Sequence, residues 1–283
     1  MFDLFTYFMV HYLQKTVKYD KILYENKRKE IFMPKFFIKS NQIENEVITI
    51  LGEDVKHISN VLRAKIGDSV HVCNIDDSSN YSAEIFEIQK ESIKCKIVEK
   101  IESEAESKIS ITIFQGVPKS DKMELIIQKS VELGVKEITP VQMERCVSII
   151  TGKDEKKKIE RWQKISEVAA KQSGRDIIPK INNCIKVKDL CNSINKYNVL
   201  IVPYEKEENN SFNSVLNDLK ESSNENISIG IVIGPEGGFE EHEIELLKLS
   251  GAKIVTLGKR ILRTETVALA MTSVIMYEFG GCI

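Results

Sequence analysis

The chain has 283 residues, and at about 150 residues per domain this length predicts roughly two domains, each able to bury its own core. Hydrophobic residues make up 42% of the chain, which excludes intrinsic disorder for most of it. Because 40 basic residues stand against 42 acidic ones, a nucleic-acid surface would have to be a local patch and not a property of the whole chain.

The first 32 residues form an extension ahead of a second start at Met33. Residues 1–13 are apolar and aromatic, but no basic segment precedes them and no small-residue cleavage site follows, so a secretory signal is not expected. A misassigned start codon or an appended helix would both produce such an extension. We predict that it is dispensable, and that a protein beginning at Met33 is soluble and active.

Neither a metal site nor a membrane span is expected. No apolar run approaches the roughly 18 residues that a membrane-spanning helix needs. The cysteines include no C-x-x-C pair, which argues against zinc and against a disulfide framework, and they are interpreted as reduced thiols of a cytoplasmic protein: Cys73, Cys95, Cys146, Cys184, Cys191 and Cys282.

Short segments that alternate between apolar and polar residues fill the region between residues 46 and 101. They predict strands at 47–51, 70–73, 81–85 and 93–97, with one helix at 54–62. This pattern is typical of a small β-barrel or sandwich, and we assign residues 33–103 to it. The polar, acidic residues around 104–108 are then a linker.

After the linker, apolar strands alternate with helices long enough to cross over a parallel sheet. The predicted strands are 109–114, 137–141, 199–202, 227–233 and 253–257, and the predicted helices are 121–133, 154–172, 264–279 and one that begins near Glu240. Residues 109–283 are therefore expected to form an α/β domain.

Two loops follow predicted strands of that domain, at the edge where open α/β sheets usually bind ligands. Gly234-Pro235-Glu236-Gly237-Gly238 allows positive φ and a close approach of the backbone to a ligand, although a plain strand-to-helix turn also explains it. The second loop runs through residues 257–266. There Thr264 is a good N-cap, while Arg263 has no structural explanation.

Two basic helix ends complete the set of motifs. Lys119 and Lys122 lie at the start of the helix predicted at 121–133, where backbone N–H groups and the helix dipole would add to an anion site. Residues 172–175 end a helix, with Gly174 as the predicted C-terminal glycine and Arg175 beside it. The sequence contains no zincin pair, no phosphate loop and no G-x-S-x-G elbow.

Together these segments resemble the RsmE family of SPOUT methyltransferases. The matching segments run in order from residue 33 to residue 279: Met33-Pro34-Lys35-Phe36-Phe37, residues 57–63 with Gly67-Asp68, Lys122-Met123-Glu124, residues 128–134, Glu144-Arg145-Cys146, Gln172-Ser173-Gly174-Arg175, residues 233–238 and Arg263-Thr264-Glu265-Thr266. Val267 departs from the family pattern, which usually has a small residue there.

The resemblance implies an N-terminal PUA-like, RNA-binding β-barrel followed by a SPOUT α/β methyltransferase domain with a trefoil knot. It also implies a homodimer that transfers a methyl group from S-adenosyl-L-methionine to N3 of uracil 1498 in 16S ribosomal RNA, either free or in the assembled small subunit. The cofactor would lie on loops at 201–205, 234–238 and 257–262. Its expected contacts are Val202, Pro203, Gly234, Pro235, Glu236, Gly237, Gly238, Leu257, Gly258, Arg260, Ile261, Leu262 and Thr266.

The chemistry assigns further roles. Uracil N3 carries a proton and is a poor nucleophile until that proton leaves. The protein therefore has to stabilise an anionic base, and Arg263 is the candidate residue for this role. Glu236 or Glu265 could accept the proton, and the sequence does not choose between them. The expected RNA contacts are basic residues of both domains: Lys35, Arg63, Lys119, Lys122, Arg145 and Arg175, with Lys39 and Lys65 on the barrel.

Two other functions compete with this interpretation. A non-catalytic RNA-binding factor of ribosome assembly could keep the fold and lose the cofactor, although the intact glycines of residues 234–238 count against it. An α/β enzyme that uses another nucleotide is disfavoured because the sequence lacks both phosphate-loop and dinucleotide-binding spacing.

Overall fold

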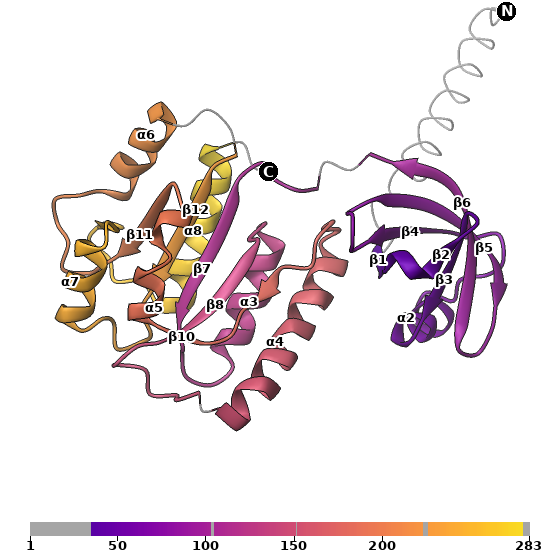
Figure 1. The fold of residues 1–283 in the computed structure, drawn as a ribbon, viewed down its shortest axis with the longest axis horizontal. Coiled ribbons are helices and arrows are strands. Elements are labelled where there is room, and N and C mark those ends of the chain that lie inside the picture. Colours follow the sequence, from indigo (N-terminus) through magenta and orange to yellow (C-terminus); the bar gives the residue numbers. More distant parts are fainter. Residues whose placement is uncertain (1–34, 103–104, 151, 223–225, 280–283) are drawn as a thin grey trace, which may run out of the picture. The chain divides into compact units, whose positions relative to one another are not determined.

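The computed structural model describes residues 35–102, 105–150, 152–222 and 226–279 (Figure 1). The predicted extension at 1–32 lies outside the described residues. The chain forms two compact units. Most of residues 35–99 belongs to the first unit, whereas residues 37–41 and 73–80 group with the second unit, which also takes the chain from residue 100 onward.

The first unit contains a six-stranded sheet with the order β1-β4-β5-β6-β3-β2. Its strands are β1 (Lys35–Ile38), β2 (Ile43–Glu44), β3 (Val47–Leu51), β4 (Ser69–Asn74), β5 (Asn80–Ile88) and β6 (Ser92–Ile101). Alternate side chains such as Ile48, Ile50 and Ile93 are almost fully buried, because successive residues of a strand point to opposite faces. The four strands predicted from alternation are confirmed, and three of them are longer than predicted.

The helix predicted at 54–62 is divided into two kinds of turn. An α-helical turn, α2 (Glu53–Lys56), leads into a π-helical segment, η2 (His57–Val61). The amide of Leu62 donates to the carbonyl oxygen of His57 at 3.0 Å, five residues back, which widens the helix. Val55 and Ile58 still point into the core, so the apolar spacing indicates the helical region without revealing the wider turn.

The second unit is built on a seven-stranded sheet with the order β10-β8-β7-β12-β11-β13, and β9 pairs with β8. The strands are β7 (Ser110–Gly116), β8 (Glu137–Gln142), β9 (Lys180–Ile181), β10 (Ile185–Lys186), β11 (Val199–Pro203), β12 (Ser228–Ile233) and β13 (Lys253–Val255). Every pairing in this sheet is parallel. The predicted α/β class is therefore confirmed.

Helices cover both faces of this sheet (Figure 1). Four helices pack with Ile111, Ile113 and Ile231 on one face: α3 (Lys122–Glu132), α4 (Gly152–Gln172), α6 (Phe212–Ser222) and α8 (Thr264–Glu278). Two shorter helices, α5 (Val187–Cys191) and α7 (Glu241–Leu249), pack with Phe114 and Val202 on the other face. The sheet thus forms the middle of three layers, and its carboxyl edge is left to the loops.

Two helices, α5 and α6, are missing from the sequence predictions. The first has five residues, too few for a periodic pattern to show. The second buries Val215, Leu216 and Leu219, a narrow stripe in an otherwise polar segment. Among the described residues, no helix is both long and apolar enough to span a bilayer.

Candidate active site

Three loops at the carboxyl edge of the sheet surround two adjoining pockets. The loops follow β11, β12 and β13, which are neighbours in the sheet, so their carboxyl ends meet at one place. The pockets have volumes of about 690 and 450 Å³. Five residues line both of them: Pro203, Glu205, Ile261, Leu262 and Val267. This is the arrangement that the strand-end loops predict.

The glycine-rich loop after β12 is packed closely against the end of β7. A Cβ atom on Gly116 would lie 2.7 Å from both the backbone nitrogen and Cδ of Pro235, which leaves room only for glycine. The turn closes with a 2.9 Å hydrogen bond from the amide of Gly238 to the carbonyl oxygen of Pro235, and Gly238 has φ +71°. The loop therefore has a fixed shape before any ligand binds.

Thr264 was predicted as the N-cap of the last helix, and that prediction is wrong by one residue. Helix α8 begins at Thr264 and Arg263 takes the N-cap position. The Thr264 hydroxyl donates to the carbonyl oxygen of Gly234 at 2.7 Å and accepts from Gln115 Nε2 at 2.8 Å. These bonds hold the start of α8, the glycine-rich loop and the end of β7 together, which explains why the hydroxyl does not cap its own helix.

The anion site predicted at the start of α3 is filled by a carboxylate of the chain itself. Lys122 Nζ lies 3.0 Å from Glu236 Oε1, and the amide of Lys119 donates to Glu236 Oε1 at 3.2 Å. Lys122 Nζ also lies 3.3 Å from Glu265 Oε2, an enclosed atom that makes no hydrogen bond of good geometry. Lys122 therefore neutralises two carboxylates beside the pocket.

These contacts decide how Glu236 and Lys122 ionise. Burial alone would raise the pKa of Glu236, but hydrogen bonds from its own amide, from Lys122 and from the amide of Lys119 outweigh burial and hold that pKa below its usual value. The hydrogen bond to Glu236 in turn raises the pKa of Lys122, with a smaller contribution from Glu265. Glu236 is therefore a stable carboxylate and a weak base.

Arg145 supports the glycine-rich loop near its C-terminal end, at Gly237 and Glu240. Its Nε donates to Glu240 Oε1 at 2.7 Å and its Nη1 to the carbonyl oxygen of Gly237 at 3.0 Å. A Cβ on Gly237 would lie 3.0 Å from the Cβ of Arg145, so a glycine is needed there for the loop to pack against that side chain. The hydrogen bond to Glu240 raises the pKa of Arg145. The predicted RNA contact is thus engaged within its own domain.

Arg263 lies on the wall of the smaller pocket, next to Thr264 and the glycine-rich loop. Its side chain is exposed, and it makes no hydrogen bond or ion pair with the residues that the structure describes. A guanidinium in this position has all of its donors available for a ligand.

Acidic side chains line the larger pocket. Glu205, Glu207 and Glu208 all face it, and Glu205 lines the smaller pocket as well. Glu207 also closes its own turn, because its carboxylate accepts hydrogen bonds from the amides of Asn209 and Asn210. The same two hydrogen bonds lower the pKa of Glu207. Lys259 and Arg260 line the same pocket, so its charge is mixed, and only the part formed by the three glutamates favours a positively charged group of a ligand.

Most of the predicted cofactor residues line these pockets: Pro203, Gly234, Pro235, Glu236, Gly237, Gly238, Leu257, Gly258, Arg260, Ile261 and Leu262. Val202 and Thr266 do not. The Val202 side chain is fully buried in the core, because alternation along β11 turns it into the layer below α7. Thr266 is exposed, one residue beyond the Glu265 side chain that turns toward Lys122.

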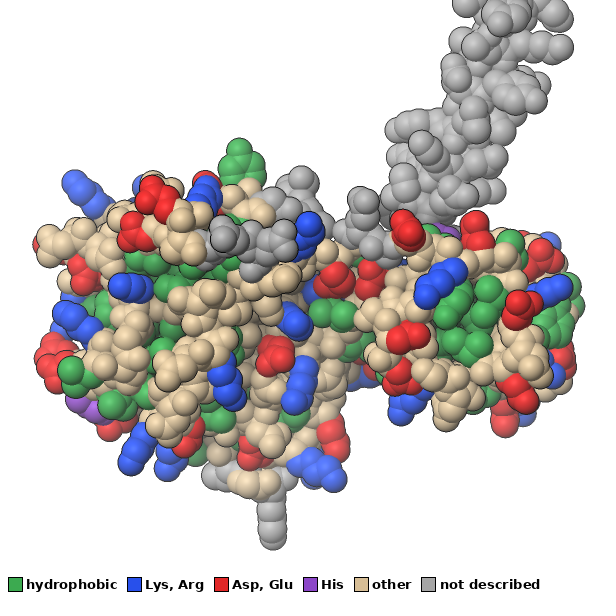
Figure 2. Space-filling view, turned by 45° about the horizontal axis from the view of Figure 1, so that its top comes forward, with side chains coloured by type: hydrophobic (Ala, Val, Ile, Leu, Met, Phe, Trp, Pro, Cys, Tyr) green, Lys and Arg blue, Asp and Glu red, His purple; other side chains and the backbone are tan. Residues whose placement is uncertain are grey.

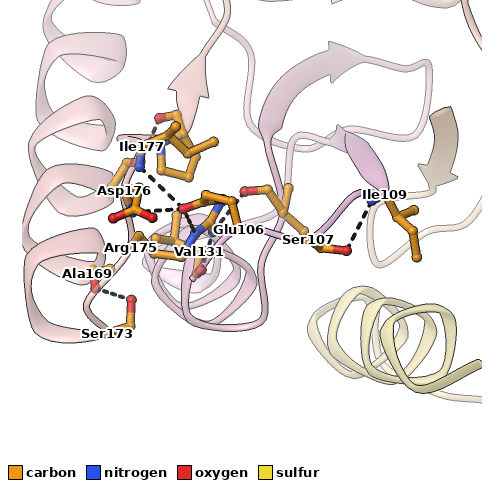
Figure 3. Close-up of polar contacts among 12 residues, drawn as sticks. Glu106, Ser107, Ile109, Val131, Ala169, Ser173, Arg175, Asp176 and Ile177 are labelled. Carbon is orange, nitrogen blue, oxygen red and sulfur yellow. Dashed lines mark hydrogen bonds and ion pairs between the residues drawn. The ribbon is translucent and has the colours of Figure 1, made fainter. Parts of the chain in front are cut away.

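Arg175 was predicted to bind RNA, and the structure corrects this. Its side chain is only 4% exposed, and its guanidinium binds both carboxylate oxygens of Glu106, at 2.8 and 2.7 Å (Figure 3). It also donates to the carbonyl oxygens of Val131 and Val135. A guanidinium with these partners is not available to a phosphate. Arg63 and Lys119, in contrast, are exposed.

The sequence patterns do not predict the role of Gln115. It is fully buried at the end of β7, where Nε2 donates to Thr264 and Oε1 has no partner among the described residues. A polar residue at the end of an otherwise apolar strand was the available signal. On the face shown in Figure 2, Lys and Arg side chains are interspersed with Asp and Glu, in line with the balanced charge of the chain.

Two family models match the chain. An RNA methyltransferase domain matches residues 105–276, and an RNA methyltransferase PUA domain matches residues 50–98. The chain is 36% identical to the Ribosomal RNA small subunit methyltransferase E of Bacillus subtilis, over 87% of this chain and 97% of that protein. It is 34% identical to the protein of the same name from Mesomycoplasma hyopneumoniae, over 84% of this chain and 96% of that protein.

Solved structures agree with the sequence matches. The chain resembles a Ribosomal RNA small subunit methyltransferase E from Neisseria gonorrhoeae bound to S-adenosyl methionine, with a TM-score of 0.76, 30% identity and coverage of 87% of this chain and 97% of that one. A methyltransferase from Legionella pneumophila, solved with bound SAM, gives a TM-score of 0.75 at 28% identity, with the same coverage.

Proposed function

Because the chain belongs to the family of ribosomal RNA small subunit methyltransferase E, we propose that it transfers a methyl group from S-adenosylmethionine to N3 of a uridine in small-subunit ribosomal RNA. The uridine expected for this family is position 1498 of 16S RNA. The observation that carries the proposal is the position of Arg263, which has no partner among the described residues and lines a pocket beside a preformed glycine-rich loop.

The residues of the two pockets fit S-adenosylmethionine. Gly237 and Gly238 line the smaller pocket, and because neither has a side chain, the loop packs closely against Arg145 and Glu205 without filling the pocket. Glu205 and Glu208 suit the positive charge and the hydroxyl groups of this cofactor. Bound there, the cofactor supplies an electrophilic methyl group that needs little activation beyond alignment.

The chain supplies stabilisation of the uracil anion. Loss of the N3 proton places negative charge on the base, and the planar fork of Arg263 can donate to one of the two carbonyl oxygens that share it, O2 or O4, and leave N3 open to the methyl group. Of the two carboxylates, Glu236 is held ionised by Lys122 and positions the glycine-rich loop against α3. Glu265 also contacts Lys122 and lines neither pocket, so proton acceptance is assigned to neither carboxylate.

RNA binding falls to the exposed cations of both units. Lys119 and Arg63 are exposed, as are Lys39 and Lys65, and we retain Lys35 in this group. Lys122 and Arg145 are paired with Glu236 and Glu240, and we assign to them the organisation of the site. Because a base within a helix hides its N3, the substrate nucleotide has to be unpaired or extruded. The protein acts where this RNA is assembled, in the cytoplasm.

A homodimer is also part of the proposal. Exposed apolar side chains lie on two helices that pack against each other, Leu125 on α3 and Val274 and Tyr277 on α8, and Tyr277 is 75% exposed. A second copy would cover this surface. Light scattering at micromolar concentration should give a mass near twice 32.3 kDa, and a monomeric mass would contradict the dimer.

The trefoil knot of SPOUT proteins is proposed on similar grounds. Three observations support it: the strand order β12-β11-β13, the three loops that meet at one edge, and the bonds of Thr264 to Gly234 and Gln115. In such an arrangement the segment before α8 passes close to the loops after β11 and β12.

Calorimetry with S-adenosylmethionine separates this proposal from an RNA-binding assembly factor without a cofactor. Micromolar binding that Gly238→Val abolishes supports the enzyme. The valine side chain would crowd Glu205 in the glycine-rich loop, and the positive φ of Gly238 strains any residue with a side chain. No binding by the wild-type protein would favour the assembly factor.

A further inference from the structure

We propose that Val267 limits the size of the alkyl group that a bound cofactor can carry on its sulfur atom, so that the site accepts a methyl group and rejects a larger one. This inference rests on the proposed function, because it takes S-adenosylmethionine as the ligand of the two pockets. Val267 and all the other residues that line these pockets belong to the second unit.

Two adjoining pockets with a shared wall suit a ligand that is made of two parts. S-adenosylmethionine consists of a nucleoside and an amino acid joined at a sulfonium centre, which also carries the methyl group. A ligand of this kind that extends through both pockets has its central sulfur where they meet. The residues that line both pockets mark this place, and they are Pro203, Glu205, Ile261, Leu262 and Val267.

Val267 is firmly held in this shared wall. Only 9% of it is exposed, and it packs in the same core cluster as Met271. Its amide donates to the carbonyl oxygen of Arg263 at 2.9 Å, in the first turn of α8. A β-branched side chain in a helix has one strongly preferred rotamer, so Val267 cannot turn away from a ligand. Ile261, in contrast, is 87% exposed and is free to turn aside.

Two neighbours in the shared wall also resist movement. Leu262 precedes the N-cap residue of α8, and Val267 is the fourth residue of that helix, which is the spacing of a hydrophobic staple. Pro203 ends β11, where it pairs with Val255 of β13, and its ring has no rotatable side-chain bond. The two methyl groups of Val267 therefore occupy a fixed part of the space where the pockets meet.

A wall that cannot relax discriminates between ligands by size. One additional CH₂ group in a closely packed site changes affinity by about tenfold or more when the surrounding side chains cannot move. An ethyl group on the cofactor sulfur would meet the branched side chain of Val267. Alanine at this position removes both methyl groups and favours the helix, so a larger alkyl group should then fit.

The test compares two cofactors that differ by one CH₂ group at sulfur. Calorimetry of the full chain measures the Kd for S-adenosylmethionine and for S-adenosylethionine. The wild-type protein should bind the ethyl compound about tenfold or more weakly, and Val267→Ala should reduce this ratio to less than about threefold. Val267→Thr keeps the branched shape and should keep the wild-type ratio. Leu257→Ala is the matched control, because Leu257 lines only the larger pocket and its loss should weaken both compounds alike.

Three results would overturn the inference: a wild-type ratio below about threefold, an unchanged ratio in Val267→Ala, or an equal fall of the ratio in Leu257→Ala. Should Val267→Ala not fold, Val267→Ile decides the matter. It should raise the Kd for S-adenosylmethionine about tenfold and that for S-adenosylhomocysteine, which lacks the methyl group, less than about threefold. An equal rise for both compounds would exclude a role of Val267 at the alkyl group. A wild-type protein that binds none of the three compounds would refute the proposed function instead.

Discussion

Lys122 Nζ lies 3.0 Å from Glu236 Oε1, so the start of α3 and the glycine-rich loop after β12 are joined by an ion pair at the edge of the smaller pocket. The pair explains why a carboxylate so close to the reacting groups is a poor base. It also predicts a pH dependence that a solvated lysine would not show.

Replacing Lys122 by Met should lower stability only where both partners are charged. The pKa of Glu236 is held below its usual 4.5, so its contribution is present above that value and is lost as the pH falls through the lower pKa of the folded state. The pKa of Lys122 is raised above 10.5, so the contribution is lost again as the pH rises through that higher value. Differential scanning calorimetry across this range should show a melting difference of about 1–2 °C that vanishes at both ends.

Lys129→Met is the matched control, since Lys129 forms an ion pair with Glu132 on the same helix, away from the pocket. It should leave methylation unchanged, whereas Lys122→Met should lower kcat about tenfold because the loop and Glu265 lose their shared cation. Equal methylation rates in the two variants would remove Lys122 from the site.

Arg263→Ala should lower kcat by about a hundredfold or more and leave the Kd for S-adenosylmethionine almost unchanged. This is the usual effect of removing one donor to the transition state. Arg263→Lys should not restore the rate, because an ammonium cannot reproduce the planar fork. Single-turnover methylation at saturating cofactor, together with calorimetric binding, measures both quantities.

Arg260→Ala is the control for Arg263→Ala. Arg260 lines the larger pocket and not the smaller one, so its loss should weaken cofactor binding more than it slows methyl transfer. If Arg263→Ala behaved like Arg260→Ala, the assignment of Arg263 to the uracil anion would be wrong.

Thr264→Val should destabilise the protein by about 1–3 kcal/mol and weaken cofactor binding. The substitution keeps the shape but leaves the Gly234 carbonyl and the Gln115 amide without their shared partner. Thr266→Val, on the same turn but exposed, should change stability by less than about 0.5 kcal/mol. Urea denaturation and calorimetry of both variants test the difference, and equal effects would contradict the structural role of the Thr264 hydroxyl.

Gly116→Ala should raise the Kd for S-adenosylmethionine by about tenfold, because its Cβ would lie 2.7 Å from backbone and ring atoms of Pro235 that cannot rotate away. Gly152→Ala is the control, since nothing lies within 4 Å of that position. An unchanged Kd in Gly116→Ala would show that the glycine-rich loop can shift without loss of the cofactor site.

The sequence alone was sufficient for both units of the fold and for the three loops of the site. Alternating strands such as Val47–Leu51 and amphipathic helices such as Lys122–Glu132 are local patterns, and they predicted local structure correctly. The glycine-rich loop could be placed because it follows the buried strand Ser228–Ile233.

The predictions that failed concern side chains whose hydrogen-bond partners lie far away in the sequence. Thr264 looked like a helix cap because its partners, Gly234 and Gln115, are 30 and 149 residues away. Arg175 looked like an RNA contact because its partner Glu106 lies 69 residues earlier, in a segment with the composition of a linker. A basic residue next to a helix end gives no sign of whether its charge will be neutralised within the fold.

Methylation of small-subunit ribosomal RNA by the purified protein is the most direct test of the proposed activity. RNA from cells that lack the gene would be incubated with isotope-labelled S-adenosylmethionine and digested to nucleosides and, in parallel, to oligonucleotides, and both digests would be analysed by mass spectrometry. We predict labelled 3-methyluridine in the nucleoside digest, label in a single oligonucleotide, and labelling about a hundredfold slower in Arg263→Ala. Label in any other nucleoside, or no label from a protein that binds the cofactor, would contradict it.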